Sequence, residues 1–258
     1  MTSISMTSPS TTKTKDQPTP RVIALVAAAG QGTRLGADVP KAYVELRGRT
    51  LLERSVRAMI TSEFVDEIIV LVSPAMEDYA SSILGRIDSD VPIRIVHGGG
   101  ERADSVWAGL QAIPEEDAVV LIHDAARALT PPGMIARVAK RVLDGATAVI
   151  PVLPVADTIK EVEGQTVLST PDRFRLRAVQ TPQGLNLAAL RRANLDYWAQ
   201  DPDFVATDDA SLMEWHGERV ETVQGDTFAF KITTPIDLVL AKAVTDEAEP
   251  TIFEVPSD

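Results

Sequence analysis

The sequence predicts an α/β fold in which a mainly parallel β-sheet is flanked by helices. Apolar, strand-like runs alternate with segments of helical spacing from residue 21 onward, which is the pattern of repeated βαβ units. The first run, residues 22–27 (VIALVA), is continuously apolar, as expected for a strand buried on both faces. The composition, 45% apolar and 24% charged over 258 residues, suits a globular protein with one sizeable core.

The expected elements follow one another at a regular rhythm. Strands are expected at residues 22–27, 67–72, 92–96, 118–122, 147–152, 220–223 and 227–232. Helices are expected at residues 50–60, 75–84, 102–113, 131–143, 185–198, 208–215 and 235–244. Right-handed crossovers bring the carboxyl ends of the strands in such a Rossmann-like sheet to one rim, where α/β proteins bind ligands. We therefore expect a single domain over residues 21–246 with its site on that rim.

Residue types at the helix ends support two of these assignments. Thr50 has the side chain of an N-cap and precedes Leu52 and Val56 at helical spacing. The helix over residues 131–143 begins at a proline and ends shortly before Gly145.

The alternation changes over residues 154–177, which we expect to form an inserted β-arm. Residues 158–162 and 166–169 alternate in polarity around a Glu-Gly-Gln turn centred on Gly164, which indicates a hairpin. A lone hairpin buries little apolar surface. We therefore expect the arm to project from the domain and to pack against a second copy of the chain.

Charge and cysteine content exclude several classes of function. The net charge is −12, from 37 acidic and 25 basic residues, which disfavours nucleic acids and anionic membranes as partners. A local basic pocket for a small anion remains compatible with that charge. The chain has no cysteine, which excludes disulfides and thiolate chemistry and fits a reducing cytoplasm. No run approaches the ~20 apolar residues of a membrane span.

Both ends of the chain are expected to lie outside the folded domain. Residues 1–20 are rich in Ser, Thr and Pro and lack an apolar stretch, so we expect a disordered tail rather than a secretory signal. Residues 247–258 are expected to form a loose, acidic tail.

The strongest local motif comes where the first strand ends. Residues 27–35 (AAAGQGTRL) are followed by Pro40-Lys41. Small residues let the backbone approach a ligand and expose N–H groups to phosphate oxygens. The candidate nucleotide-binding residues in this loop are Ala28, Ala29, Gly30 and Gly32. Arg34 can bind phosphate with two donors, and Lys41 adds a point charge.

The motif is neither a Walker loop nor a dinucleotide fingerprint. Taken alone, it could also be a glycine-rich turn with two exposed bases.

Two later loops are expected on the same rim. Gly99 and Ser105 lie in residues 98–106 (GGGERADSV), between a strand and a helix. Asp124 and Arg127 lie in residues 123–127 (HDAAR), directly after a strand. On residue types alone, residues 98–106 could instead be a helix start, and Asp124 in residues 123–127 could be a turn-forming aspartate.

These motifs, in this order, resemble those of the 2-C-methyl-D-erythritol 4-phosphate cytidylyltransferase family of the non-mevalonate isoprenoid pathway. The resemblance also includes the following segments: 157–158 (DT), 181–183 (TPQ), 207–210 (TDDA) and 231–233 (KIT). It extends over about residues 21–244. It implies a homodimeric nucleotidyltransferase that joins CMP from CTP to 2-C-methyl-D-erythritol 4-phosphate and releases pyrophosphate. The chain departs from the family pattern at Gly100, Ala128 and Ala229, where relatives commonly have an acidic residue, Pro and Asn.

The resemblance implies a role for each candidate residue. Gly99 and Ser105 would contact the cytosine or ribose. Asp124 would bind hydroxyls of the polyol, with Arg127 close to the same substrate. The remaining substrate ligands would be Thr158, Arg173, Thr207 and Lys231, of which Thr158 and Arg173 would reach from the arm into the partner subunit's site. On sequence grounds alone, Thr158 and Arg173 could equally be solvated surface residues.

The implied reaction needs fixed positive charge more than a proton acceptor. The second pKa of a phosphate monoester is ~6, so the attacking oxygen is already ionised and no general base is required. His123 is accordingly expected to be a structural hydrogen-bonding residue. Arg34 and Lys41 would stabilise the α-phosphate and the departing pyrophosphate, while Arg173 and Lys231 would orient the attacking phosphate.

Magnesium would bridge the CTP phosphates, because it prefers phosphate oxygens, water and a carboxylate or two. The sequence assigns no protein ligand to this ion. Two other functions compete with this interpretation: a cytidylyltransferase acting on ribitol 5-phosphate, and a non-catalytic nucleotide sensor.

Overall fold

The computed structural model describes residues 19–30, 32, 39–200 and 203–247. The expected N-terminal tail, apart from Thr19 and Pro20, and residues 248–258 of the expected C-terminal tail lie outside the described residues. Within the described residues, no helix is both long and apolar enough to cross a membrane.

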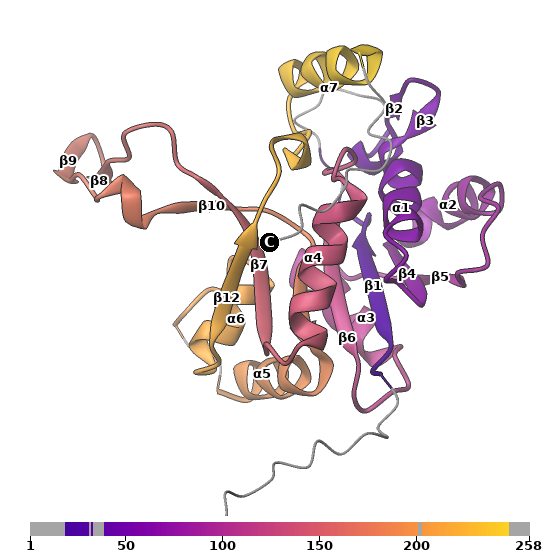
Figure 1. Cartoon of the computed structure of the whole chain (residues 1–258), viewed down its shortest axis with the longest axis horizontal. Helices are drawn as coiled ribbons and strands as arrows, with labels where there is room; N and C mark the ends of the chain where they lie inside the picture. The colour runs from indigo at the N-terminus through magenta and orange to yellow at the C-terminus, as the bar shows by residue number, and fades with distance from the viewer. Residues whose placement is uncertain (1–18, 31, 33–38, 201–202, 248–258) are drawn as a thin grey trace, which may run out of the picture.

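The centre of the fold is an eight-stranded mixed sheet in which most neighbours are parallel (Figure 1). Its strands are β1 Val22–Ala27, β4 Glu67–Val72, β5 Ile93–His97, β6 Val119–Asp124, β7 Ala148–Pro154, β10 Arg177–Val179, β11 Gln183–Asn186 and β12 Val220–Gln224. The order is β10-β7-β11-β6-β1-β4-β5, with β12 paired to β7. The β6-β1-β4-β5 portion and the β12–β7 pair are parallel, whereas β10 and β11 are antiparallel to their neighbours. The predicted fold class is confirmed.

Alternate residues of the central strands supply two separate cores. Ala24 and Val26 of β1 face one cluster, which α1 Leu51–Thr61, α2 Glu77–Leu84 and α4 Pro132–Leu143 complete. Ile23 and Leu25 face the other cluster.

The second cluster is completed by three helices on the opposite face of the sheet. They are α3 Arg102–Gln111, α5 Leu187–Gln200 and α6 Asp209–Trp215. Since successive side chains of a strand point to opposite faces, the continuously apolar β1 is buried on both sides, as predicted.

A smaller cluster anchors the last helix, α7 Pro235–Glu247, beside the start of α1. A short hairpin, β2 Glu45–Leu46 and β3 Arg49–Thr50, lies between them and was not expected from the sequence. Its turn places both Arg47 and Gly48 at positive φ. As predicted, Thr50 caps α1, because its Oγ1 accepts a hydrogen bond from Glu53 N–H at 3.1 Å.

The expected strand over residues 227–232 is wrong. The structure has a short 3₁₀ helix, Thr227–Ala229, in which the Asp226 side chain accepts a hydrogen bond from Phe228 N–H. Ile232 N–H then donates to Ala126 O at 2.9 Å. The backbone thus bonds to the loop after β6 instead of a sheet edge, so Lys231 follows an irregular segment and not a strand.

The expected helix over residues 185–198 begins later than predicted. Leu185 and Asn186 belong to β11, and the helix starts at Leu187. Asn186 Oδ1 accepts a hydrogen bond from Ala189 N–H at 3.0 Å, which marks the start of the helix.

The arm is present as a separate two-stranded sheet, β8 Glu161–Glu163 and β9 Thr166–Ser169, with Gly164 at positive φ in its turn. Residues 156–170 are all exposed. Figure 1 shows the arm extending away from the central sheet, on the side opposite α2. Its predicted role in dimerisation stays a prediction.

Candidate active site

The candidate site lies where β1 and β6 end side by side. Their parallel register pairs Ala27 with Asp124, so the loops that follow both strands emerge together. A cavity of about 150 Å³ opens there. Its lining residues are Ala27, Ala28, Ala29, Gly30, Lys41, Ala42, Arg102, Ser105, Asp124, Ala125, Ala126 and Lys231. Six residues predicted to contact nucleotide or substrate therefore meet in one cavity: Ala28, Ala29, Gly30, Ser105, Asp124 and Lys231. Lys41, predicted to be catalytic, lines it as well.

Asp124 is the buried carboxylate of this cavity and is held between two cations. Lys231 Nζ lies 2.7 Å from its Oδ2, and Arg102 Nε donates to its Oδ1 at 3.2 Å. Burial would raise the pKa of Asp124, but the charges of Arg102 and Lys231 lower it well below its usual range. The carboxylate is therefore ionised near pH 7, and its orientation is fixed by these two contacts within the chain.

Arg102 extends this network to a second buried carboxylate. Its Nη2 donates to Asp209 Oδ2 at 2.7 Å. The charge of Asp209 is the main cause of a raised Arg102 pKa, and burial opposes it. Arg102 and Asp209 both belong to motifs that the sequence singled out, but neither was predicted to be a site residue. The sequence did show that Arg102 and Asp209 are charged residues in two loops of the rim. If such residues are buried, they need partners of opposite charge, because unpaired charges are rarely buried.

His123 is completely buried beside Asp124 and is bonded within the protein. Its Nδ1 lies 3.1 Å from Thr181 Oγ1, which also accepts a hydrogen bond from Asp124 N–H. Burial lowers the pKa of His123 to about 4. The imidazole is therefore neutral near pH 7 and has no route to a substrate, in agreement with the structural role expected for it.

The glycine-rich turn approaches its neighbours closely. Gly32 has φ +57°, and a Cβ at this position would lie 2.6 Å from Lys41 Cβ. A side chain here would push the Lys41 segment away from the turn. Gly98 also lies close to Ser105 and Ala29. A Cβ at Gly98 would lie 2.5 Å from Ser105 Oγ. Gly98 and Ser105 thus bring the loop after β5 against Ala29 in the loop after β1.

Several predicted residues do not line this cavity. Arg127 donates to Ala229 O at 2.7 Å and to Val179 O at 3.3 Å, so its guanidinium joins three chain segments. Gly99 lies against Asp104, and exposed Thr207 precedes α6. Gly32 supports the turn from outside the lining. Arg34 lies outside the described residues.

Thr158 and Arg173 lie at a distance from the cavity, on the arm. Both are exposed, and Arg173 Nη1 donates to Ala156 O at 2.9 Å within the arm itself. Within one chain, the structure does not bring these two residues to the cavity of Asp124.

In the described part of the chain, no group of three or more His, Cys, Asp or Glu side chains could hold a metal ion. The two carboxylates of the cavity network, Asp124 and Asp209, are already bound by Arg102 and Lys231. Both carboxylates of this network are therefore engaged by cationic side chains.

Comparison with known proteins identifies one family for this chain. A family model described as 2-C-methyl-D-erythritol 4-phosphate cytidylyltransferase matches residues 22–247. The chain is 70% identical over 241 residues to the protein of that name from Corynebacterium diphtheriae, covering 92% of this chain and 99% of the relative. Identity to the protein of the same name from Rhodococcus jostii is 51% over 227 residues, covering 88% and 96%.

Solved structures agree with this result. The crystal structure of 4-diphosphocytidyl-2C-methyl-D-erythritol synthase from Anaerococcus prevotii superposes with a TM-score of 0.77 at 30% identity, covering 89% of this chain and 100% of that one. The 2-C-methyl-D-erythritol 4-phosphate cytidylyltransferase of Thermus thermophilus gives 0.70 at 35% identity, covering 88% and 99%. The family match includes every described residue of the cavity, and the chain therefore belongs to the 2-C-methyl-D-erythritol 4-phosphate cytidylyltransferase family.

Proposed function

We propose that this protein transfers CMP from CTP to 2-C-methyl-D-erythritol 4-phosphate, forming 4-diphosphocytidyl-2-C-methyl-D-erythritol and pyrophosphate. One observation carries the proposal: Lys41, Arg102 and Lys231 converge with a glycine-rich turn on one cavity, around the buried carboxylate of Asp124. The cations suit two facing phosphate groups, and the carboxylate suits the hydroxyls of a polyol.

In the proposed reaction, an oxygen of the substrate phosphate attacks the α-phosphorus of CTP, and the bond to the β-phosphate oxygen breaks. The electron pair of that bond leaves with pyrophosphate. The transition state concentrates negative charge, so the protein contributes mainly positioning and positive charge. The turn at Ala28, Ala29 and Gly30 would receive phosphate oxygens, and Lys41, with Arg34, would stabilise the leaving group.

Lys231 is suited to orient the attacking phosphate. An ammonium group has three N–H donors, and Lys231 directs one of them at Asp124 Oδ2. Its side chain is 43% exposed and lines the cavity, so the remaining donors would be available to a bound phosphate. Asp124 would meanwhile accept hydrogen bonds from polyol hydroxyls.

A magnesium ion would take its ligands mainly from the CTP phosphates and water. The engaged state of Asp124 and Asp209 supports this arrangement, and Mg²⁺ binds in this way where few carboxylates are available. The ion would supply charge neutralisation for the triphosphate. EDTA should abolish turnover without changing the thermal unfolding midpoint, and added Mg²⁺ should restore it; unchanged turnover in EDTA would contradict the proposal.

The arm would complete the site of a second subunit. Val162, Val167 and Leu168 are each more than half exposed, and Phe174 is 78% exposed. A monomer gains nothing from such an apolar, projecting surface, whereas an isologous dimer would bury it. Thr158 and Arg173 would then contact the substrate phosphate in the partner subunit's cavity. The acidic charge and lack of cysteine fit a cytoplasmic enzyme without nucleic-acid partners.

Pyrophosphate release is the measurement that tests this function. We expect release with CTP and 2-C-methyl-D-erythritol 4-phosphate, none with CTP alone, and much slower release with ribitol 5-phosphate. Equal kcat/KM for the two polyol phosphates would contradict the assigned substrate. CTP binding without release in any mixture would instead indicate a nucleotide sensor.

A further inference from the structure

Residues 180–183 (QTPQ) form a buried segment between two strands of the central sheet. β10, which pairs with β7, ends directly before Gln180, and β11, which pairs with β6, begins at Gln183. Gln180 N–H also donates to Pro151 O in β7 at 2.9 Å. The sheet therefore fixes the backbone of this segment at both ends, and its side chains extend from a rigid base.

The side chain of Gln180 pairs with the backbone of a single residue, Asp226. Its Oε1 accepts a hydrogen bond from Asp226 N–H at 2.9 Å, and its Nε2 donates to Asp226 O at 2.7 Å. A carboxamide has one acceptor oxygen and two N–H donors, so these partners fix the orientation of the amide. Gly225 leaves room for the contact, because a Cβ at Gly225 would lie 2.4 Å from Gln180 Oε1.

Asp226 begins the short segment that leads to Lys231. Its side chain accepts a hydrogen bond from Phe228 N–H at 2.8 Å, and its carbonyl accepts one from Ala229 N–H at 3.1 Å. These bonds close the 3₁₀ turn, and Lys231 follows that turn and lines the active-site cavity. The position of the Lys231 ammonium group therefore depends on a turn that Gln180 holds at its start.

Gln183 holds a second loop of the site in the same way. Its Nε2 donates to Asp208 Oδ2 at 2.6 Å, and its Oε1 accepts a hydrogen bond from Ala210 N–H at 2.9 Å. Asp209 lies between these two partners, and its Oδ2 accepts a hydrogen bond from Arg102 Nη2 at 2.7 Å. Gln183 therefore fixes the start of α6 and, with it, the carboxylate that holds Arg102.

Thr181 lies between the two glutamines and contacts a third loop. Its Oγ1 accepts a hydrogen bond from Asp124 N–H at 3.1 Å. A buried hydroxyl or carboxamide needs partners anywhere in a protein, but that need does not specify where the partners lie. In this segment, they lie at or beside the residues that position Asp124, Asp209 and Lys231.

We propose that Gln180 and Gln183 are positioning residues for the polyol phosphate, Gln180 through Lys231 and Gln183 through Asp209 and Arg102. This inference rests on the proposed function, which assigns Lys231 to the attacking phosphate. Neither glutamine lines the active-site cavity, so each acts only through the loop that it holds. The two glutamines should therefore affect the polyol phosphate more than CTP, and by separate routes.

Double-mutant cycles in pyrophosphate release separate these two routes. Gln180→Met and Gln183→Met keep the length of the side chain but remove the amide. Each should raise KM for the polyol phosphate about tenfold and KM for CTP less than about twofold. In kcat/KM, Gln183→Met should add little to the loss caused by Arg102→Gln, but its full factor to that caused by Lys231→Ala. Gln180→Met should show the reverse pattern.

Full additivity in every pair would overturn the proposal, because it would show a general loss of structure. Equal changes in KM for the two substrates would also overturn it. Gln180→Glu is the conservative variant, since it keeps the acceptor for Asp226 N–H and loses only the donor. Its loss should be intermediate.

Amide hydrogen exchange of the full chain tests the same contacts without substrate. Gln180→Met should speed exchange over residues 226–231, and Gln183→Met over residues 208–211, while the amides of β1 stay unchanged. Exchange equal to that of the parent protein in both loops would overturn the proposal. A parent protein that releases no pyrophosphate would instead contradict the proposed function, whatever the exchange shows.

Asn194→Leu is the matched control for both measurements. Asn194 is a buried carboxamide of α5, and its Nδ2 donates to Leu190 O at 2.9 Å within that helix. Its removal should leave exchange in residues 208–211 and 226–231 unchanged, as well as KM for both substrates. The same effects in this variant as in the glutamine variants would show that loss of any buried amide disturbs the site, and would overturn the proposal.

Discussion

The two halves of the proposed active site differ in how their side chains are held. In the domain half, Asp124 is 9% exposed and bonded to both Arg102 and Lys231. In the arm half, Thr158 and Arg173 are exposed, and Arg173 contacts a carbonyl and the Phe174 ring of the arm itself. The domain half is thus preorganised within one chain, whereas in the proposed dimer the arm half would take its position from the partner subunit. Substitutions in the two halves should therefore behave differently.

The largest effect is expected in the domain half, at Lys41. Lys41→Ala should lower kcat/KM roughly 10²–10³-fold, the loss typical for removal of one fixed charge that stabilises a transition state. The unfolding midpoint and the dimer mass should be unchanged. Steady-state pyrophosphate release checks the first expectation and light scattering the second. Near-normal turnover would remove Lys41 from the catalytic residues.

Burial of His123 should make the stability of the domain half depend on pH. Its folded pKa, about 4, lies below the unfolded value of 6.5. The stabilisation is therefore complete above pH 6.5 and is lost as the pH falls from 6.5 to 4, by ~3 kcal/mol in total. Urea unfolding at several pH values measures this slope.

The control for this measurement is His123→Asn, which keeps a polar partner for Thr181 but does not titrate. The other two histidines, His97 and His216, remain in both proteins. The same slope in the variant and the parent protein would show that His123 does not cause the pH dependence.

A moderate effect is expected at Arg102, which orients Asp124 through a hydrogen bond to its carboxylate. Arg102→Gln should raise KM for the polyol phosphate about tenfold, the cost of one charge-assisted hydrogen bond. KM for CTP should change less, because Asp124 is assigned to the polyol. Arg102→Lys should recover part of the loss. Equal changes in both KM values would indicate a general structural role.

The most direct test of the comparison comes from mixing subunits, where only a partial recovery of activity is expected. Lys41→Ala and Arg173→Ala chains should each be nearly inactive alone. Random exchange makes half of the dimers mixed, and each mixed dimer would have one intact site. About a quarter of the parent activity should therefore return. Confirmed subunit exchange without recovery would show that Arg173 acts within its own chain.

The sequence by itself determined the α/β class, most element positions and seven of the residues that line the cavity at the rim. The reason is local: apolar runs, caps such as Thr50 and small residues after β1 carry their meaning over a few positions. Strand 227–232 was mispredicted because its apolar residues face the loop after β6, a contact that pattern alone does not show.

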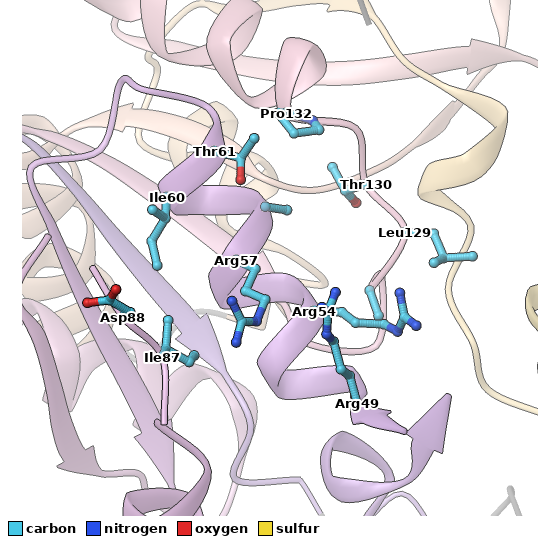
Figure 2. A pocket seen from close by; sticks show the side chains of 12 residues that line it. Arg49, Arg54, Arg57, Ile60, Thr61, Ile87, Asp88, Leu129, Thr130 and Pro132 are labelled. Atoms are coloured by element: carbon cyan, nitrogen blue, oxygen red, sulfur yellow. The ribbon is translucent and has the colours of Figure 1, made fainter. Parts of the chain in front are cut away.

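Only the tertiary structure decided how the charges pair. Arg102 and Asp209 are 107 residues apart in sequence, and Lys231 is as remote from Asp124, yet all four groups form one network. Which carboxylate binds which cation depends on where the sheet and helices place the loops. The cavity lined by Arg54, Arg57 and Leu129 likewise combines α1 with the loop after β6 (Figure 2). Such pairings follow from packing over long separations, which residue spacing does not encode.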